Sequence, residues 1–358
     1  MLDTSRFSFR PFGLAAALAF ALVGCGDTAS KPAAEGAPKA TEKTIVGVVF
    51  DSGGRGDKSF NDSAYAGVQR ASEKFSLDVR TIDSKKDSDY EGNITGLAEQ
   101  GAKLVFAVGM GQGLALEAAA KKFPDVKFAI VDTVVDAPNV RSLLFSEEQG
   151  SFLAGYAAAL VSKSGKVGFV GGKKIDLIEK FEAGFTAGAK LAKPGITVLP
   201  AKYTDSWDDT SKGKALAAVL YGDGADVVYH AAGRAGLGVF AAVKEANGSG
   251  PITKYAIGVD SNQDDIEKGM VLTSMLKRVD EAVFSTIEDT VGDKFSGGTK
   301  RYDLKANGVG LTDFANTKDV IGADNMAKIE AVSARIKAGE IVVPEKLADI
   351  AAFLAKTK

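Results

Sequence analysis

The chain has 358 residues but only one cysteine, one histidine and one tryptophan. Because Cys25 is alone, no disulfide can form within the chain. A structural zinc site of the cysteine and histidine type needs about four ligands, and Cys25 and His230 are the only candidates and lie far apart in the sequence. A catalytic dyad or triad that uses histidine would need His230. The composition therefore excludes a zinc site of this type, and we expect no bound metal and no cofactor.

Neither sign of charge is in large excess. The 44 lysines and arginines almost balance the 46 aspartates and glutamates, and the net charge is −2. A nucleic-acid-binding protein usually carries a basic surface, so we expect no nucleic acid partner. The hydrophobic fraction of 45% is ordinary for a globular protein. The length favours two lobes over one small domain.

The N-terminus reads as a targeting segment. Arg6 and Arg10 precede the apolar run Phe12–Val23, which is shorter than the roughly 20 residues that a membrane-spanning helix needs. The run ends in LVGC, which resembles the lipobox of bacterial lipoproteins. We therefore expect a signal peptide at 1–24 and acyl chains on Cys25, which would anchor the protein in a membrane. The alternative is a buried cysteine in an uncleaved helix.

The next segment has the composition of a linker. Residues 26–43 contain no large apolar side chain and are rich in alanine, lysine, proline, glycine and threonine. Such a segment cannot form a core. We expect a flexible tether over 25–43.

From Thr44 onward, short apolar strands alternate with helical stretches. This alternation predicts an α/β fold with parallel sheets covered by helices on both faces. The predicted strands are Ile45–Phe50, Val79–Ile82, Leu104–Val108, Phe128–Val131, Ser142–Phe145, Val167–Val170, Thr197–Tyr203, Val227–Tyr229, Tyr255–Val259 and Val271–Leu276.

We expect two doubly wound lobes that are joined by a hinge and meet at a cleft. The first would comprise 44–146 plus 264–314, and the second 147–263 plus 315–358. The Gly-rich region 296–310 suggests a hairpin or a strand that crosses between the lobes.

Open α/β sheets bind ligands beyond the carboxyl ends of their strands. After the first strand, Ser59 and Asp62 have the spacing of a capping box and predict a helix start. Phe60 and Asn61 would then lie in the first helical turn, at the mouth of the cleft. Phe60 could contact a flat ligand ring or, alternatively, form a staple-like contact with its own helix.

Other strand ends carry further candidate ligand contacts. These are Asp132, Trp207, Gly233, Asp260 and Lys277. Aromatic rings can stack on a ligand ring, and carboxylates accept hydrogen bonds from hydroxyl or ring N–H groups. An aspartate at a strand end can also simply cap a helix or form a turn. His230 ends a buried strand, where a structural role is favoured.

Several segments resemble the basic membrane protein family of bacterial lipoproteins. They are IVGVVFDSGGRGDKSFNDSAYAGV, the FAIVD strand, EEQGSFLAGYAAALVSKSGKVGFVGG, FEAGFTAG, and DVVYHAAGRAGLGVF with GVDSNQ. They cover roughly residues 44 to 280. The resemblance implies a type I periplasmic-binding-protein fold and a purine nucleoside-binding, substrate-binding component of an ABC transporter.

The resemblance also implies that the base lies between two aromatic rings, one from each lobe. The first matches Phe60. For the second we expect Trp207, although the family more often has phenylalanine there, and Phe181 is the alternative.

The polar contacts are implied in the same way. Asn61 and Asp132 would bind the base edges, and Asp260 and Lys277 would bind the ribose hydroxyls. Gly233 would let the backbone approach the sugar.

The expected function is thus capture of adenosine, guanosine or inosine by a monomeric, lipid-anchored receptor that faces the periplasm or the cell exterior. The receptor would pass its ligand to an ABC permease with its ATPase, without catalysis. The alternatives are a sugar or signalling molecule as ligand, a sensory role, or an α/β enzyme that uses His230.

Overall fold

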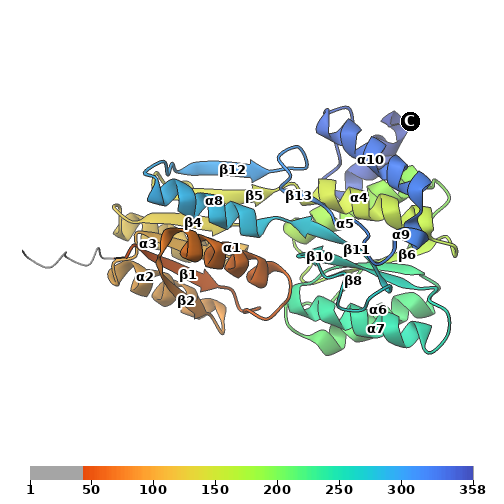
Figure 1. Ribbon diagram of the computed structural model, residues 1–358, viewed down its shortest axis with the longest axis horizontal. Coiled ribbons are helices and arrows are strands. Elements are labelled where there is room, and N and C mark those ends of the chain that lie inside the picture. Colours follow the sequence, from red (N-terminus) through yellow and green to blue (C-terminus); the bar gives the residue numbers. More distant parts are fainter. Residues whose placement is uncertain (1–42, 358) are drawn as a thin grey trace, which may run out of the picture. The chain divides into compact units, whose positions relative to one another are not determined.

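The computed structural model describes residues 43–357. The predicted signal peptide, Cys25 and all but the last residue of the predicted tether fall on residues 1–42, outside the described residues. The described part is an α/β protein built on two sheets, as expected (Figure 1). None of the helices within 43–357 is long and apolar enough to cross a membrane.

The first sheet has the strand order β12-β5-β4-β3-β1-β2, and all of its strands are parallel. Its strands are β1 (Ile45–Phe50), β2 (Asp78–Asp83), β3 (Leu104–Val108), β4 (Lys127–Val131), β5 (Val140–Phe145) and β12 (Gly298–Tyr302). Its helices are α1 (Phe60–Phe75), α2 (Tyr90–Glu99), α3 (Gly113–Lys122) and α8 (Val279–Val291), with short 3-10 turns at Asp87–Asp89 and Met110–Gln112. We call this sheet and these helices the first lobe.

Successive residues of β1 pack on opposite faces of this sheet, which explains its unbroken apolar run. Val48 and Phe50 share a core with α1 and α8. Val49 shares another core with α2 and α3. The first lobe therefore has helices on both faces (Figure 1).

The second sheet has the order β13-β11-β10-β9-β6-β7, with β8 also paired to β6. Its strands are β6 (Lys166–Gly171), β7 (Thr197–Val198), β8 (Lys202–Tyr203), β9 (Val227–Ala231), β10 (Tyr255–Asp260), β11 (Val271–Lys277) and the antiparallel β13 (Val309–Leu311). The helices that cover it are α4 (Glu147–Val161), α5 (Asp176–Ala192), α6 (Thr210–Gly222) and α7 (Leu237–Asn247), with a 3-10 turn at Gly233–Gly236. We call these elements and the C-terminal tail the second lobe.

The tail consists of α9 (Lys318–Ile321), α10 (Ala323–Lys337), a 3-10 turn at Leu347–Asp349 and α11 (Ile350–Lys356). Helix α10 packs on α4 and α11 packs on α5. The tail thus lies against the helices of the second lobe.

Within residues 43–357, three connections cross between the lobes. They run from β5 to α4 at Ser146, from β11 to α8 at Arg278, and from β12 to β13 through residues 303–308. We expected the whole of 264–314 in the first lobe, but the topology divides it. Strands β11 and β13 pair in the second sheet, whereas α8 packs on α1 and β12 pairs with β5. The hairpin alternative for 296–310 is also wrong, because β12 and β13 belong to different sheets.

One predicted strand is broken. Residues 197–203 form two short strands, β7 and β8, that flank Pro200. Proline has no backbone N–H to donate to a strand ladder. The expectation of a continuous strand was therefore wrong at this edge of the sheet.

Helix α1 begins at Phe60 as predicted, but the capping box does not form. Ser59 makes no side-chain cap. The carboxylate of Asp57 instead accepts the backbone N–H groups of Ser59, Asn61 and Asp62, at 2.9, 2.9 and 3.1 Å. The Ser59 hydroxyl donates to Asp260 of the second lobe. An interlobe hydrogen bond thus replaces the local cap.

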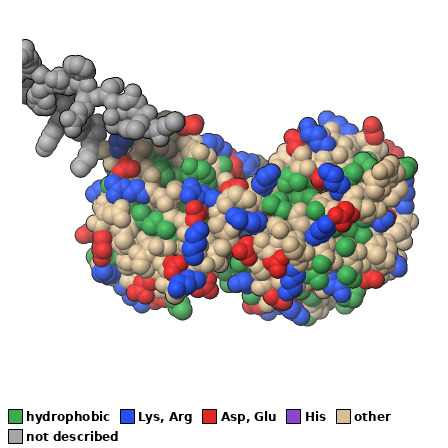
Figure 2. All heavy atoms as spheres, turned by 90° about the horizontal axis from the view of Figure 1, so that it is seen from below, with side chains coloured by type: hydrophobic (Ala, Val, Ile, Leu, Met, Phe, Trp, Pro, Cys, Tyr) green, Lys and Arg blue, Asp and Glu red, His purple; other side chains and the backbone are tan. Residues whose placement is uncertain are grey.

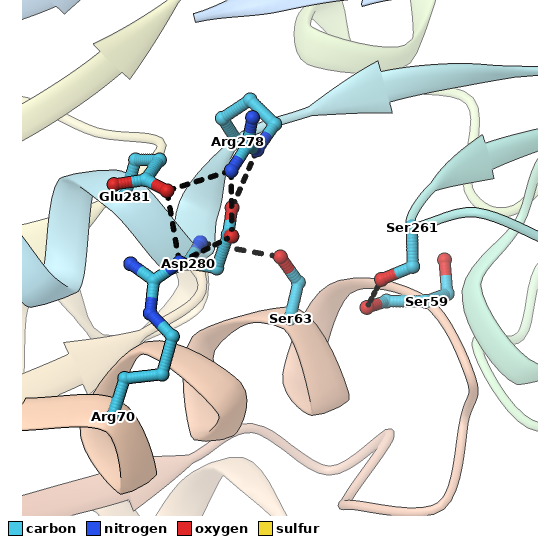
Figure 3. Close-up of polar contacts among 7 residues, drawn as sticks. All are labelled: Ser59, Ser63, Arg70, Ser261, Arg278, Asp280 and Glu281. Carbon is cyan, nitrogen blue, oxygen red and sulfur yellow. Dashed lines mark hydrogen bonds and ion pairs between the residues drawn. The ribbon is translucent and has the colours of Figure 1, made fainter. Parts of the chain in front are cut away.

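An ion cluster fastens α8 to α1 beside the connection at Arg278 (Figure 3). The Arg278 guanidinium pairs with Asp280 at 2.9 Å and Glu281 at 2.7 Å, and Arg70 of α1 reaches Glu281 at 2.9 Å. The Ser63 hydroxyl also accepts the backbone N–H of Asp280. On the face seen in Figure 2, basic and acidic side chains are interspersed, in keeping with the balanced composition.

Candidate functional site

A cavity of about 260 Å³ lies between the two lobes. It is lined from the first lobe by residues after β1, at the start of α1, after β2, after β3 and after β4. From the second lobe it is lined by residues after β6, on α5, after β8, and at the ends of β9, β10 and β11. The cavity therefore lies at the carboxyl ends of strands from both sheets, where a ligand is expected in this fold class.

The structure brings all the ligand-binding candidates from the sequence to this one cavity. Its lining includes Phe60, Asn61, Asp132, Trp207, Gly233, Asp260 and Lys277. The alternative aromatic, Phe181, also lines it.

The aromatic rings come from different lobes. Phe60 projects from the first turn of α1, and Trp207 lies in the loop between β8 and α6; both are half-buried. A methyl group on Gly172 would lie 2.2 Å from the Trp207 ring, so the ring packs directly on the backbone there. Phe181 is buried and belongs to the second-lobe core.

Lys277 supplies a buried positive charge. Its side chain is 2% exposed, and its Nζ lies 2.7 Å from Asp132 and 3.1 Å from Glu147. Burial alone would lower the pKa of Lys277, but the carboxylates of Asp132, Glu147 and Asp260 outweigh it and raise that pKa above its ordinary value. Lys277 thus stays an ammonium in the cavity wall.

Asp132 and Asp260 occupy equivalent positions, each directly at the end of a strand. Their φ angles are 72° and 64°, in the left-handed region that costs free energy for any residue except glycine. Such conformations gather at functional sites. Asp260 accepts the Ser59 hydroxyl, and burial raises its pKa to about 7 despite the opposing effect of Lys277.

Sequence reasoning assigned no role to several lining residues. Asp51 follows β1 and accepts Nδ2 of Asn61 at 3.0 Å; burial raises its pKa to about 6. Asp57 caps α1, and Tyr90 begins α2. The strand-end rule that selected Asp132 would also have selected Asp51, whereas nothing in the sequence distinguishes Tyr90.

The cavity has an excess of negative charge. Among the described residues, five carboxylates line it (Asp51, Asp57, Asp87, Asp132, Asp260) against three cations (Lys173, Arg234, Lys277). Within residues 43–357, the buried Oδ1 atoms of Asn61 and Asp132 have no hydrogen-bond partner. The arrangement suits a ligand that offers N–H and O–H donors, and it disfavours an anion.

His230 stands apart from the cavity lining. It is fully buried, its Nε2 lies 3.1 Å from Oε1 of Gln263, and burial lowers its pKa to about 4. Its ring also packs on Gly236, where a methyl group would lie 1.9 Å from Nδ1. The environment is that of a neutral structural histidine, as the sequence favoured.

Comparison with known proteins agrees with this geometry. The family described as "ABC transporter substrate-binding protein PnrA-like" matches residues 44–346. The chain belongs to this family. This match confirms the resemblance drawn from the sequence. The family consists of substrate-binding proteins and not enzymes.

Individual relatives cover most of the chain. It is 38% identical to the ABC transporter nucleoside-binding protein BmpA of Lactococcus lactis subsp. cremoris, over 84% of this chain and 88% of that protein. It is 34% identical to basic membrane protein A of Borreliella burgdorferi, over 87% and 89%. A solved ABC transporter solute-binding protein from Aeropyrum pernix K1 superimposes with a TM-score of 0.80 at 28% identity, covering 88% of this chain and 99% of that one.

Proposed function

We propose that this substrate-binding protein captures purine nucleosides in the interlobe cavity and delivers them to the permease of an ABC transporter. One observation carries the proposal: a single cavity combines half-buried aromatic rings from opposite lobes with a buried aspartate–lysine cluster. A purine nucleoside has the matching parts, a flat base and a polar sugar. The nucleoside-binding relative supports this choice of ligand.

In this proposal the base stacks between Phe60 and Trp207. Both rings are half-buried and line the cavity, so part of each ring is accessible to a ligand. Phe181 is only 3% exposed and is already packed in the core of the second lobe. We therefore favour Trp207 as the second wall.

The polar groups divide between base and sugar. Asn61, hydrogen-bonded to Asp51, would bind the base edge. The resemblance assigned Asp132 to the base as well, but its 2.7 Å contact with Lys277 groups it with the lysine. We propose that Asp132, Lys277 and Asp260 together bind the ribose hydroxyls, with the Gly233 backbone beside them.

Ligand contacts from both lobes would favour a closed arrangement. The described structure already has hydrogen bonds between the lobes. Arg234 of the second lobe donates to the carbonyl of Arg55 at 2.6 Å, and Gln263 donates to the carbonyl of Lys58 at 3.0 Å. A ligand in the cavity would add to these contacts and hold the lobes together.

Truncation of either stacking ring tests the proposal. Phe60→Ala and Trp207→Ala should each weaken purine nucleoside binding by about 1–3 kcal/mol, because each removes one stacking surface. Titration calorimetry with inosine and adenosine measures the loss. Phe295→Ala, which removes a half-buried ring outside the cavity lining, should bind normally. Wild-type affinity in both cavity variants would refute the base sandwich.

We also propose that acyl chains on Cys25 anchor the protein in the cell membrane, facing the periplasm or the cell exterior. Two or more acyl chains give stable anchoring, whereas one gives marginal binding. In cells fed radiolabelled palmitate, the wild-type chain should be labelled and sediment with membranes. Cys25→Ala should lose both properties. Labelling of the variant, or release of the wild type into the soluble fraction, would contradict lipid attachment at Cys25.

A further inference from the structure

The ammonium of Lys277 is shared between carboxylates with different access to the cavity. Asp132 lines the cavity and lies 2.7 Å from Nζ. Glu147 lies 3.1 Å from Nζ but, among the described residues, is not part of the lining and is 1% exposed. Glu147 can therefore reach a ligand only through Lys277.

The Glu147–Lys277 pair sits where the lobes are joined. Glu147 is the first residue of α4, directly after the connection at Ser146. Lys277 is the last residue of β11, directly before the connection at Arg278. The ion pair therefore ties two interlobe connections to each other beside the cavity. A carboxylate in the first turn of a helix is also stabilised by the helix dipole.

Glu147 has no other polar role in the described structure. Its Oε2 is buried without a hydrogen-bond partner among residues 43–357, and its Oε1 contacts Lys277. Burying a carboxylate costs free energy unless an opposite charge pairs with it, and here Lys277 is that charge. Without it, Nζ of Lys277 would be drawn to Asp132 and Asp260, whose oxygens would then be less available to ligand hydroxyls.

We propose that Glu147 is a positioning residue for ligand binding: from the connection between the lobes, its carboxylate shares the Lys277 ammonium with Oδ2 of Asp132, so that Oδ1 of Asp132 and the carboxylate of Asp260 remain available to accept hydrogen bonds from the ligand. This inference rests on the proposed function, because it takes a hydroxyl-bearing nucleoside as the ligand.

The surrounding charges decide how the pair titrates. Those that act on Glu147 or on the cavity carboxylates are Lys277, Asp132 at the end of β4, Asp260 at the end of β10, Asp57 before α1, Glu148 in α4, and Lys180 of α5 paired with Glu345. Burial raises the pKa of Glu147 and raises that of Asp260 to about 7. Lys277 opposes both shifts. When Glu147 loses its charge, the ammonium of Lys277 interacts more strongly with Asp260, which lowers the pKa of Asp260.

The test is the pH dependence of nucleoside affinity in the full chain. Wild-type affinity for inosine should rise with pH through about 7 as Asp260 ionises and becomes an acceptor. Glu147→Gln should bind about tenfold more weakly at neutral pH, because the Lys277 ammonium would then be drawn to Asp132 and Asp260 and would compete with the ligand hydroxyls for their oxygens. Its pH midpoint should lie below that of the wild type. General loosening of the fold would weaken binding without moving the midpoint in this direction.

Two further variants serve as controls. Glu148→Gln removes a neighbouring buried carboxyl that makes no ion pair with Lys277 in the described structure, and it should keep wild-type affinity at neutral pH. Glu147→Asp keeps the charge on a shorter side chain and should recover part of the affinity and the midpoint. Wild-type affinity and midpoint in Glu147→Gln would overturn the inference, and so would an equal loss in Glu148→Gln.

A ligand-independent measurement separates this inference from the proposed function. Glu147→Gln should lower the melting temperature of the wild type but raise that of Lys277→Met, where it removes an unpaired buried carboxylate. If this coupling is present but the wild type binds no purine nucleoside, the proposed function fails and the ion pair has only a structural role. If the two substitutions are additive, Glu147 does not act through Lys277 and the inference fails.

Discussion

Lys277→Met should weaken purine nucleoside binding by about 3 kcal/mol or more, which is a loss of more than ~100-fold. Methionine keeps much of the side-chain volume but removes the ammonium that we assign to the ribose. It also leaves Asp132 and Glu147 without their shared counter-ion. Titration calorimetry with inosine at neutral pH measures the loss.

The same substitution should lower the free energy of unfolding by about 3–5 kcal/mol, because it breaks a buried ion pair by removing one partner. Lys74→Met is the matched control. Lys74 and Glu288 also lie 2.7 Å apart, but their side chains are 53% and 48% exposed. Loss of such a surface pair should cost about 1 kcal/mol or less. Equal destabilisation of the two variants, or wild-type affinity in Lys277→Met, would contradict the role given to the buried cluster.

Gly155→Ala should produce the other large effect, on stability. Helices α4 and α5 cross so closely that a methyl group on Gly155 would lie 1.9 Å from the carbonyl oxygen of Phe185. Methyl groups on Gly184 and Gly188 of α5 would likewise lie 2.2 and 2.0 Å from backbone carbonyl oxygens of α4. The obstacles are backbone atoms, so the helices must separate. We expect a loss of about 3 kcal/mol in the free energy of unfolding.

Urea denaturation checks this expectation, and Gly96→Ala provides the control. Gly96 lies inside α2, and a methyl group there meets nothing within 4 Å. Alanine should stabilise that helix by up to about 1 kcal/mol, because it is the better helix former. If Gly155→Ala unfolds at the same urea concentration as the wild type, the close crossing of α4 and α5 is wrong.

Strands that are buried on both faces were the most predictable part of the fold. Ile45–Phe50 and Leu104–Val108 have the predicted bounds, because every residue of such a strand must be apolar. The placement of Val271–Lys277 could not be predicted in the same way. An apolar strand next to an interlobe connection has the same pattern in either sheet, and only its pairing with β10 decides between them.

The site residues that directly follow strands could be predicted, because open α/β sheets bind ligands beyond the carboxyl ends of their strands. Parallel strands bring their carboxyl ends to one edge of each sheet, and a cleft between two such lobes faces both edges. Asp132 of the first sheet and Asp260 of the second could therefore be assigned to one site from the sequence. Glu147 could not be found in this way. At the start of a helix, a glutamate is normally interpreted as a solvated residue in a favourable first turn. Its carboxylate can be buried because Lys277 pairs with it. Lys277 lies far away in the sequence, and the two residues meet only because both lie beside connections between the lobes.

The central claim is that the cavity binds an uncharged purine nucleoside. The most direct test is titration calorimetry on protein that has been unfolded, dialysed and refolded to remove any bound ligand, with guanosine, inosine, adenosine, ribose and GMP as titrants. At least one nucleoside should bind with one-to-one stoichiometry. Ribose should bind at least about 30-fold more weakly, because it lacks a base to stack on two rings. GMP should also bind much more weakly, because its phosphate enters a cavity with an excess of carboxylates. No heat with any nucleoside, or ribose binding as tightly as the best nucleoside, would contradict the claim.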